Sequence, residues 1–437
     1  MNMTPKEVVK YLDEYIIGQK NAKKTIAIAL RNRYRRMQLD KEWQDDIMPK
    51  NILMIGSTGV GKTEIARRIA KMIKVPFVKV EASKYTEVGF VGRDVESMIR
   101  DLVYNSMNLV KEELKEENKD KIEDYVLDEI TKKLLPPLPA NASETKKAEY
   151  NLTFQKMKEK VKNGDFDDKV IKIEIEDKKQ TEDSNLPPEM LKAQENLSKM
   201  FNIFEKKEPK EVTIIQAKKL LQEVASDKVI NQEEIKLEAI KRAENGIVFI
   251  DEIDKIAVSS SHRQDPSKEG VQRDLLPIVE GSVVNTKYGN VNTDHILFIS
   301  AGAFHLSKPS DLIPELQGRF PLRVELDSLD EEALYKILTE PKHSLIKQYE
   351  KLLEVEGVEL IFKEEALKAM AKNAFLANEK TEDIGARRLH TITEKVLEEI
   401  NFDADEYKGQ KYEITSEYVE EKLGTIVESE DIAKYIL

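Results

Sequence analysis

The stretch Asn51-Ile-Leu-Met-Ile-Gly-Ser-Thr-Gly-Val-Gly-Lys-Thr63 decides the fold of this chain. From Gly56 to Thr63 it matches the phosphate-binding loop pattern G-x-x-x-x-G-K-[ST] at every fixed position. A short buried strand is predicted over residues 51–55 and an amphipathic helix over 63–74, the context that the motif needs. Glycines let successive N–H groups face one concavity at a helix N-terminus. We therefore predict that the chain binds a nucleoside triphosphate, with Lys62 on the phosphates and the Thr63 hydroxyl on Mg²⁺.

A second buried strand is predicted from Gly246 to Glu252, where four apolar residues are followed by two carboxylates. Parallel strands place such acids at their C-terminal tip, where sites in open α/β sheets lie. We expect Asp251 to hold the coordination shell of Mg²⁺, directly or through water, and Glu252 to orient and deprotonate the attacking water. Ordinary turn acids would give the same pattern, but the phosphate loop upstream favours the catalytic interpretation.

Composition limits the class of protein. The 437 residues suffice for two to four domains, and the formal net charge of −12 argues against a broad nucleic-acid surface. The absence of cysteine excludes disulfides and thiolate chemistry and fits a reducing compartment. No signal peptide or membrane-spanning stretch is recognised, so a soluble cytoplasmic protein is expected.

An inserted domain is predicted between the two motifs. They belong to what we take as adjacent strands of one small sheet, yet they lie roughly 190 positions apart, far beyond a crossover helix. The intervening segment is charge-rich and contains the prolines of Leu135–Pro139. A half-exposed strand is predicted where Ile171, Ile173 and Ile175 alternate with charged residues. The fold class is therefore α/β with a parallel sheet, a largely helical insertion and a helix-rich C-terminal domain. The predicted divisions are 1–110 (first part of the nucleotide-binding domain), 111–230 (insertion), 231–330 (second part) and 331–437.

The N-terminal region leaves two questions open. Thr4 begins a helix with a capping box that Glu7 closes. Ile16 and Ile17, which follow it, are either core residues or a cover for an adenine ring. The arginine cluster within residues 31–36 is better explained as a solvated helix end than as a nucleic-acid patch.

Three further features have no obvious structural reason. Phe90 stands between glycines in Gly89–Gly92, where a mobile loop would present it outward. Arg319 follows Gly318 on a rigid exposed corner, where a surface salt bridge is the favoured explanation if the residue is considered by itself. The end of the chain is apolar through Leu437, as in a docked strand or an anchor for a partner.

Together these motifs resemble the AAA+ ATPases of the Clp/Hsp100 family, and within it the HslU (ClpY) unfoldases of the HslUV protease. The resemblance covers nearly the whole chain and is weakest across the insertion. A long intermediate domain and the lack of a cysteine zinc module distinguish it from ClpX. The segments that carry the resemblance are Tyr15–Gln19, Gly89–Leu102, Asp251–Lys255, Ile313–Arg319 and Ile384–Leu389.

The resemblance implies an AAA+ core and a ring, usually of six subunits, with ATP at subunit boundaries. Arg319 would be a catalytic finger that reaches the neighbour's γ-phosphate, and Arg387 would sense the nucleotide of its own subunit. Ile17 and Glu315 would line the nucleotide pocket. The remaining nucleotide contacts would be Gly59, Val60, Gly61, Lys62, Thr63, Glu64 and Asp251.

The resemblance also implies a protein-handling role, in which ATP hydrolysis drives unfolding and translocation of proteins into an HslV-type peptidase ring. Gly89, Phe90, Val91 and Gly92 would form the central pore loop, with Phe90 in place of the usual tyrosine. Ser300 stands where a polar sensor residue is expected. Tyr435, Ile436 and Leu437 would dock into the peptidase and activate it.

Three alternatives stay open at this stage. A stand-alone AAA+ chaperone would use the same motor without the peptidase. A small-molecule kinase would need the phosphate loop and the Mg²⁺ carboxylate but should be a monomer or dimer. A nucleic-acid motor would share the ring, although the net charge of −12 argues against it.

Overall fold

The structure is a computed structural model that describes residues 3–47, 50–86, 92–139, 143–174, 209–258 and 266–428. The chain divides into two compact units. The first comprises Met1–Leu102, Glu244–Ser282 and Asn292–Leu437, and the second comprises Val103–Ala243 and Val283–Val291. The predicted insertion over 111–230 falls wholly within the second unit. The four-part division of the sequence stays a prediction.

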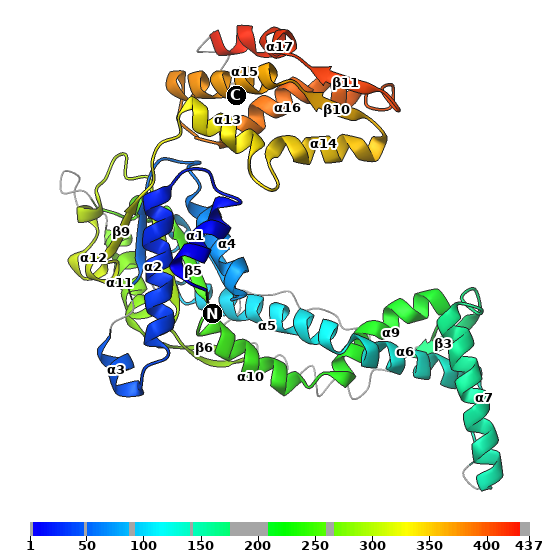
Figure 1. The fold of residues 1–437 in the computed structure, drawn as a ribbon. Helices are drawn as coiled ribbons and strands as arrows, with labels where there is room; N and C mark the ends of the chain where they lie inside the picture. The colour runs from blue at the N-terminus through cyan, green and yellow to red at the C-terminus, as the bar shows by residue number, and fades with distance from the viewer. Residues whose placement is uncertain are drawn as a thin grey trace. The chain divides into compact units, whose positions relative to one another are not determined.

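The first unit is built around a five-stranded parallel sheet, seen in Figure 1 behind the helices of the N-terminal region. In spatial order its strands are β2 (Phe77–Glu81), β5 (Ile247–Asp251), β8 (Leu297–Gly302), β1 (Ile52–Ile55) and β9 (Leu322–Glu325). The parallel sheet was predicted, but the adjacency of the two motif strands was not correct. β8 pairs with both β1 and β5 and therefore separates them.

One face of this sheet packs against the N-terminal helices (Figure 1). These helices are α1 (Pro5–Asp13), α2 (Lys20–Arg36) and α4 (Lys62–Ile73), and the short α3 (Lys41–Asp46) follows α2. Alternate residues of the strands, such as Ile52 and Met54 of β1, meet Ile65 of α4 in a core from which water is excluded. The predicted capping box of α1 is present, with Thr4 and Glu7 bonded to each other's backbone N–H.

Shorter elements follow the strands of the first unit. They are η1 (Ala82–Lys84) after β2, η3 (Ile253–Lys255) after β5, α11 (Pro266–Glu280), η4 (Pro309–Asp311) and α12 (Pro314–Arg319). Two of them, η3 and α11, carry residues that line the cavity described below.

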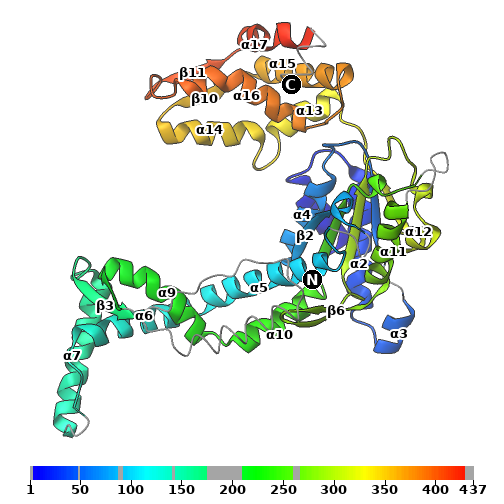
Figure 2. The same cartoon turned by 180° about the vertical axis from the view of Figure 1, so that it is seen from behind.

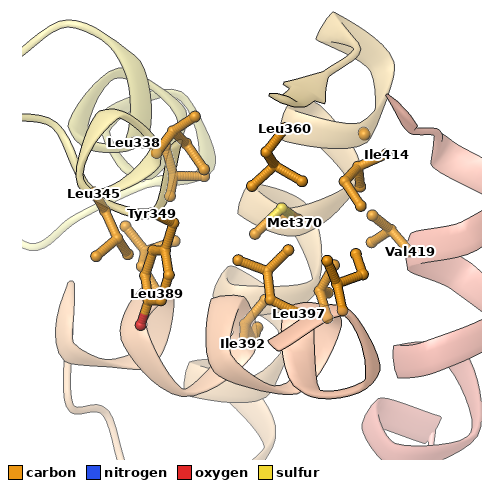
Figure 3. Close-up of a cluster of buried hydrophobic side chains, with 14 of the residues drawn as sticks. Leu338, Leu345, Tyr349, Leu360, Met370, Leu389, Ile392, Leu397, Ile414 and Val419 are labelled. Atoms are coloured by element: carbon orange, nitrogen blue, oxygen red, sulfur yellow. The ribbon is translucent and has the colours of Figure 1, made fainter. Parts of the chain in front are cut away.

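The C-terminal region is helical, as predicted, with one small parallel strand pair. Its elements are α13 (Glu331–Thr339), α14 (Leu345–Glu356), β10 (Glu359–Phe362), α15 (Glu364–Lys380), α16 (Arg387–Phe402), β11 (Lys411–Ile414) and α17 (Ser416–Glu428). Figure 3 shows Met370 of α15 at the centre of its core, among side chains from α16, β10 and β11. Leu389 and Ile392 on one face of α16 are fully buried there, as the helical spacing predicts.

The second unit has a hydrophobic core of its own, formed mainly by α6 and α9, which lie side by side in Figures 1 and 2. Its elements are α5 (Ser97–Glu117, which begins in the first unit), α6 (Lys119–Leu134), α7 (Glu144–Asn163), β3 (Val170–Glu174), β4 (Pro209–Thr213), α9 (Ile214–Val229), α10 (Gln232–Ala243), β6 (Val283–Thr286) and β7 (Gly289–Asn292). The predicted alternation is confirmed on β3, where Ile171 and Ile173 are buried. Ile175 lies outside the described residues. In the described part of the chain, no helix combines the length and the apolar character needed to cross a bilayer.

Candidate nucleotide site

The phosphate-binding loop connects β1 to α4. Gly59 and Gly61 adopt positive φ angles of 78° and 102°, which only glycine tolerates at low cost. Gly61 is the N-cap of α4, and no side chain caps this helix. The N–H groups of its first turn therefore remain available to an anion, and the helix dipole favours negative charge at this place.

Lys62 is the first residue of α4 and is only 9% exposed. Its Nζ donates to the carbonyl oxygens of Gly56 at 2.5 Å and Ser57 at 2.7 Å. Burial lowers the pKa of Lys62, while the nearby carboxylates of Asp251 and Asp254 act in the opposite direction. An ammonium group in this position gains charge-assisted bonds when a phosphate arrives, which is the chemistry that the loop motif requires.

Thr63 and Asp251 face each other between α4 and the tip of β5. The Thr63 hydroxyl lies 3.5 Å from Asp251 Oδ2, and the ammonium of Lys79 lies 2.8 Å from the same oxygen. Hydroxyl and carboxylate oxygens are the ligands that Mg²⁺ prefers, and this ion is usually held by one or two protein groups together with phosphate oxygens. The described residues contain no cluster of three His, Cys, Asp or Glu side chains that could hold a metal without such help. The pair therefore fits a magnesium ion that arrives with its nucleotide.

Glu252 directly follows β5 in a left-handed conformation with φ of 57°. This backbone costs an ordinary side chain about 1–2 kcal/mol, and such strain is concentrated at functional sites. The Glu252 N–H donates to Asp251 Oδ1 at 3.1 Å, and the hydroxyl of Ser83 donates to Glu252 Oε2 at 2.9 Å. The two neighbouring carboxylates thus have different hydrogen-bond partners, and the separate roles expected for Asp251 and Glu252 stay predictions.

Ile16 and Ile17, left open between core packing and covering a base, both line the cavity. Ile16 is 6% exposed and also belongs to the core beside the sheet, whereas Ile17 is half-buried. The buried ammonium of Lys23 fixes this segment by donating to the Ile16 carbonyl at 2.5 Å and to Asp13 Oδ1 at 2.6 Å.

Gln19 anchors the same segment to the other end of the sheet. Its side-chain amide bonds both backbone groups of Asp327, with Nε2 2.8 Å from the carbonyl oxygen and Oε1 2.9 Å from the N–H. Asp327 lies between β9 and α13, so this contact connects the cavity wall to the start of the C-terminal region.

The C-terminal region reaches the phosphate loop through two facing glycines. A Cβ added to Gly59 would lie 2.0 Å from the Ile384 carbonyl oxygen, and one added to Gly385 would lie 2.6 Å from the Thr58 carbonyl oxygen. The Ala386 N–H donates to the Gly59 carbonyl at 3.2 Å. Backbones can approach this closely only where neither residue has a side chain.

The next two residues, Arg387 and Arg388, have different surroundings. Arg387 lines the cavity with its side chain exposed. Arg388 is 4% exposed and bonds the Thr381 hydroxyl at 2.7 Å and the Glu382 carbonyl at 2.8 Å. Arg387 is therefore positioned to meet a ligand, while Arg388 holds together the loop that presents it.

These groups surround one cavity of about 1490 Å³, which is large enough for a nucleoside triphosphate. The predicted residues that line it are Ile17, Gly59, Val60, Gly61, Lys62, Thr63, Glu64, Asp251, Glu252 and Arg387. Lys79, Asp254 and His390 line it too and were not predicted from the sequence. Asp254 follows the recognised Asp-Glu pair by two residues and could have been included, whereas nothing local marked the other two.

The comparisons with known proteins agree with this geometry. A family model described as "ATPase family associated with various cellular activities (AAA)" matches residues 52–133, and one described as "AAA domain (Cdc48 subfamily)" matches residues 168–323. The chain is 64% identical over 440 residues to a Campylobacter jejuni protein named ATP-dependent protease ATPase subunit HslU, with all of both chains covered. A Helicobacter pylori protein of the same name is also 64% identical, with all of this chain and 99% of the relative covered.

This chain belongs to the HslU family of AAA ATPases. The expected fold, an α/β AAA+ core with a parallel sheet, is confirmed by the matches and by the five-stranded sheet.

Two residues that the HslU resemblance assigns to the nucleotide do not line the cavity of the single subunit. Glu315 is exposed on α12, and Arg319 ends that helix. The surface salt bridge that was the alternative explanation for Arg319 is present, because its Nε donates to Glu280 Oε1 at 2.9 Å. The partner is 39 positions away in sequence, so no local pattern announces it. The roles of both residues stay predictions.

Other expectations from the HslU resemblance lie largely outside the described residues. Of Gly89, Phe90, Val91 and Gly92, only Gly92 is described, and it is exposed. Tyr435, Ile436 and Leu437 are not described either. Ser300 is described: it is fully buried on β8, and its hydroxyl has no hydrogen-bond partner within the described part of the chain.

The arginines near the end of α2 are not simply a solvated helix end. Arg36 donates from Nε to the Ile47 carbonyl and from Nη2 to the Gln44 carbonyl, both at 2.5 Å, and so secures α3. Arg33 bonds the carbonyl of His295, and burial lowers the pKa of Arg33 to about 10. Arg33 and Arg36 therefore bond backbone carbonyls of other segments.

Proposed function

We propose that this chain is the ATP-hydrolysing unfoldase of a ring-shaped, two-component protease. In this proposal it unfolds substrate proteins in the cytoplasm, feeds them into an HslV-type peptidase and activates that peptidase. One observation carries the proposal. Lys62, Asp251, Glu252 and Arg387 meet around one cavity, in a chain 64% identical along its whole length to subunits named for an ATP-dependent protease.

The cavity supports binding of ATP with Mg²⁺. The loop N–H groups, the α4 N-terminus and Lys62 would bind the β- and γ-phosphates. Thr63 and Asp251 would hold the metal, which supplies charge neutralisation between the β- and γ-phosphate oxygens. Lys79, whose Nζ lies 2.8 Å from Asp251 Oδ2, would compete with the metal for this carboxylate.

Glu252 would act as the general base. Its carboxylate accepts a proton from the water that attacks the γ-phosphorus, and the bond to the β–γ bridging oxygen breaks to release ADP. The hydroxyl of Ser83 donates to Glu252 Oε2, and Oε1 would accept the proton of the water. Lys62 stays with the phosphates and offsets the negative charge that develops on the leaving oxygen.

The remaining assignments need more than one subunit. Arg319 would reach the γ-phosphate of a neighbouring copy, and Glu315 would border the same nucleotide from that side. A ring of subunits, usually six in the resembling family, satisfies both. Force on substrate would come from Gly89 to Gly92 through the aromatic ring of Phe90, whose grip depends on bulk and needs no hydroxyl. Tyr435 to Leu437 would dock on the peptidase.

The decisive experiment mixes this chain with the HslV-type peptidase from the same source and follows cleavage of a small fluorogenic peptide. Stimulation of cleavage that requires both ATP and this chain is the expected result. A variant that lacks Tyr435 to Leu437 serves as the matched control, since it should hydrolyse ATP normally and fail to stimulate the peptidase.

Other outcomes of this experiment and its controls would favour a different function. ATP turnover by a nucleotide-dependent ring without stimulation of the peptidase would favour a stand-alone AAA+ chaperone. Loss of both ATP turnover and stimulation on removing the tail would mean that the tail is structural. Phosphate transfer to a small acceptor by a monomer would indicate a kinase, and stimulation by DNA or RNA with steep salt dependence a nucleic-acid motor.

A further inference from the structure

An ion pair joins the last residues of two helices in the first unit. α11 ends at Glu280 and α12 ends at Arg319. One oxygen of the carboxylate, Glu280 Oε1, lies 2.9 Å from Arg319 Nε and 2.8 Å from Nη2. We propose that Glu280 is a positioning residue that holds Arg319 against its own subunit until the terminal phosphate of a neighbour's ATP replaces the carboxylate. This inference rests on the proposed function, in which Arg319 acts on a neighbouring copy.

The backbone of Glu280 is fixed on both sides. The buried hydroxyl of Thr293 donates to the Ile278 carbonyl at 2.8 Å and accepts from the Ser282 N–H at 2.8 Å. Gly281 between them has φ of 115°, and a Cβ there would overlap a neighbouring carboxylate. These contacts hold the end of α11 in place and with it the backbone of Glu280.

The backbone of Arg319 is held in place as well. Leu316 of α12 and Phe320, which directly follows the helix, are 0% and 2% exposed. Gln272 of α11 is fully buried, and its Oε1 accepts from the Ile313 N–H at the start of α12 at 2.8 Å. The two helices are thus joined through a buried amide, and the ion pair forms between parts that already lie together.

Helix stability gives no reason for a glutamate at residue 280. A carboxylate at a helix C-terminus lies at the negative end of the helix dipole, and the last turn of α11 contains no basic residue to offset it. The charge of Glu280 is instead compensated by Arg319, from another helix. Glu280 is thus unfavourable for its own helix but forms an ion pair with Arg319. We therefore explain Glu280 by its effect on Arg319.

The ion pair between Glu280 and Arg319 can position the guanidinium and can still be replaced by a phosphate. Arg319 is 29% exposed and Glu280 is 36% exposed, so water screens their attraction. A phosphate in a closed subunit interface offers several anionic oxygens at lower dielectric and forms stronger charge-assisted bonds. The exchange is therefore favourable once a neighbour carries ATP, and the carboxylate imposes a small cost on it.

The test is the substitution Glu280→Gln in the full-length chain, with ring assembly verified by sedimentation velocity. Removal of the competing charge should lower the KM for ATP about two- to fivefold, the range set by an exposed ion pair, while kcat changes less than twofold. The matched control is Glu269→Gln, which removes a 30%-exposed carboxylate from the same helix where it lies 2.7 Å from Arg273. The control should leave the KM unchanged.

A second measurement separates this inference from the proposed function. In Arg319→Ala, whose turnover should be lost, the added Glu280→Gln change should not alter the affinity of assembled rings for a non-hydrolysed ATP analogue. An unchanged KM in Glu280→Gln, or a tenfold fall in kcat with an unaltered melting temperature, would overturn the exchange. Full turnover by Arg319→Ala would instead refute the role in trans, and the exchange with it.

Discussion

The contact between the phosphate loop and the C-terminal region depends on Gly385, and the substitution Gly385→Ala tests it. The residue has φ of 57°, and its new Cβ would lie 2.6 Å from the Thr58 carbonyl oxygen and 2.9 Å from the Gly59 carbonyl carbon. Both contacts are with backbone atoms, so no side-chain movement relieves them. The loop that carries Arg387 must withdraw, and the bond from the Ala386 N–H to the Gly59 carbonyl is lost.

The expected loss of ATP affinity has two parts. The backbone bond is worth about 0.5–1.5 kcal/mol, and a displaced Arg387 loses a charge-assisted contact of about 1.5–3 kcal/mol. Together these give on the order of 2–4.5 kcal/mol, or roughly 30- to 1,600-fold weaker binding. The assay is an equilibrium titration with a fluorescent ATP analogue, accompanied by thermal unfolding of each variant.

The control variant is Gly409→Ala, which isolates the backbone effect. Gly409 has φ of 80° and no atom within 4 Å of an added Cβ, so alanine there carries only the left-handed penalty of about 1–2 kcal/mol. Its melting temperature should fall while ATP binding stays near that of the unmodified chain. Equal ATP affinity for the two variants would refute the reasoning, because the close approach at Gly385 would then contribute nothing to the site.

Three other predictions concern separate parts of the first unit. Glu252→Gln should bind ATP with little change but hydrolyse it at under about 1% of the normal rate, the lower bound for losing a general base, and normal turnover would contradict the assigned role. Burial and the charge of Arg36 lower the pKa of His295 below 6.5, so the unfolded state takes up a proton first. Stability should therefore fall as the pH drops from 6.5 to the folded-state pKa, and denaturant midpoints of His295→Asn should show a smaller fall. Gln19→Leu removes both hydrogen bonds to Asp327 and should lower the free energy of unfolding by about 1–3 kcal/mol, measured by urea titration. An unchanged urea midpoint would mean that these two bonds add no stability.

The parts of the site that lie within one short stretch could be predicted from the sequence. The loop from Gly56 to Thr63 has its chemistry and its flanking strand and helix in immediate succession, so the motif and its context support each other. The same holds for Asp251 and Glu252 at the tip of a four-residue apolar run. In both stretches the predicted strand is present, and the helix predicted after the loop is present as α4.

The parts that depend on distant partners could not be predicted. The place of β8 between β1 and β5 follows from sheet assembly, and strands of similar apolar character leave the order open. Lys79 is an outward residue of β2 with no motif of its own, and the close approach of Gly59 to Gly385 joins positions more than three hundred residues apart. The same limit explains the arginines of α2, whose partners are carbonyls that no sequence pattern reports.

The insertion also has a consequence for how the chain folds. β2 and β5 are hydrogen-bonded neighbours, yet about 165 residues, most of them in the second unit, separate Glu81 from Ile247. Closing a flexible loop of that length has an entropic cost that grows with its logarithm, and pairings between such distant strands are intrinsically slow. A second unit with its own hydrophobic core can collapse first and replace the long flexible loop with an already ordered connection. The second unit contributes no strand to the central sheet, yet its length and its own folding therefore determine how fast that sheet forms.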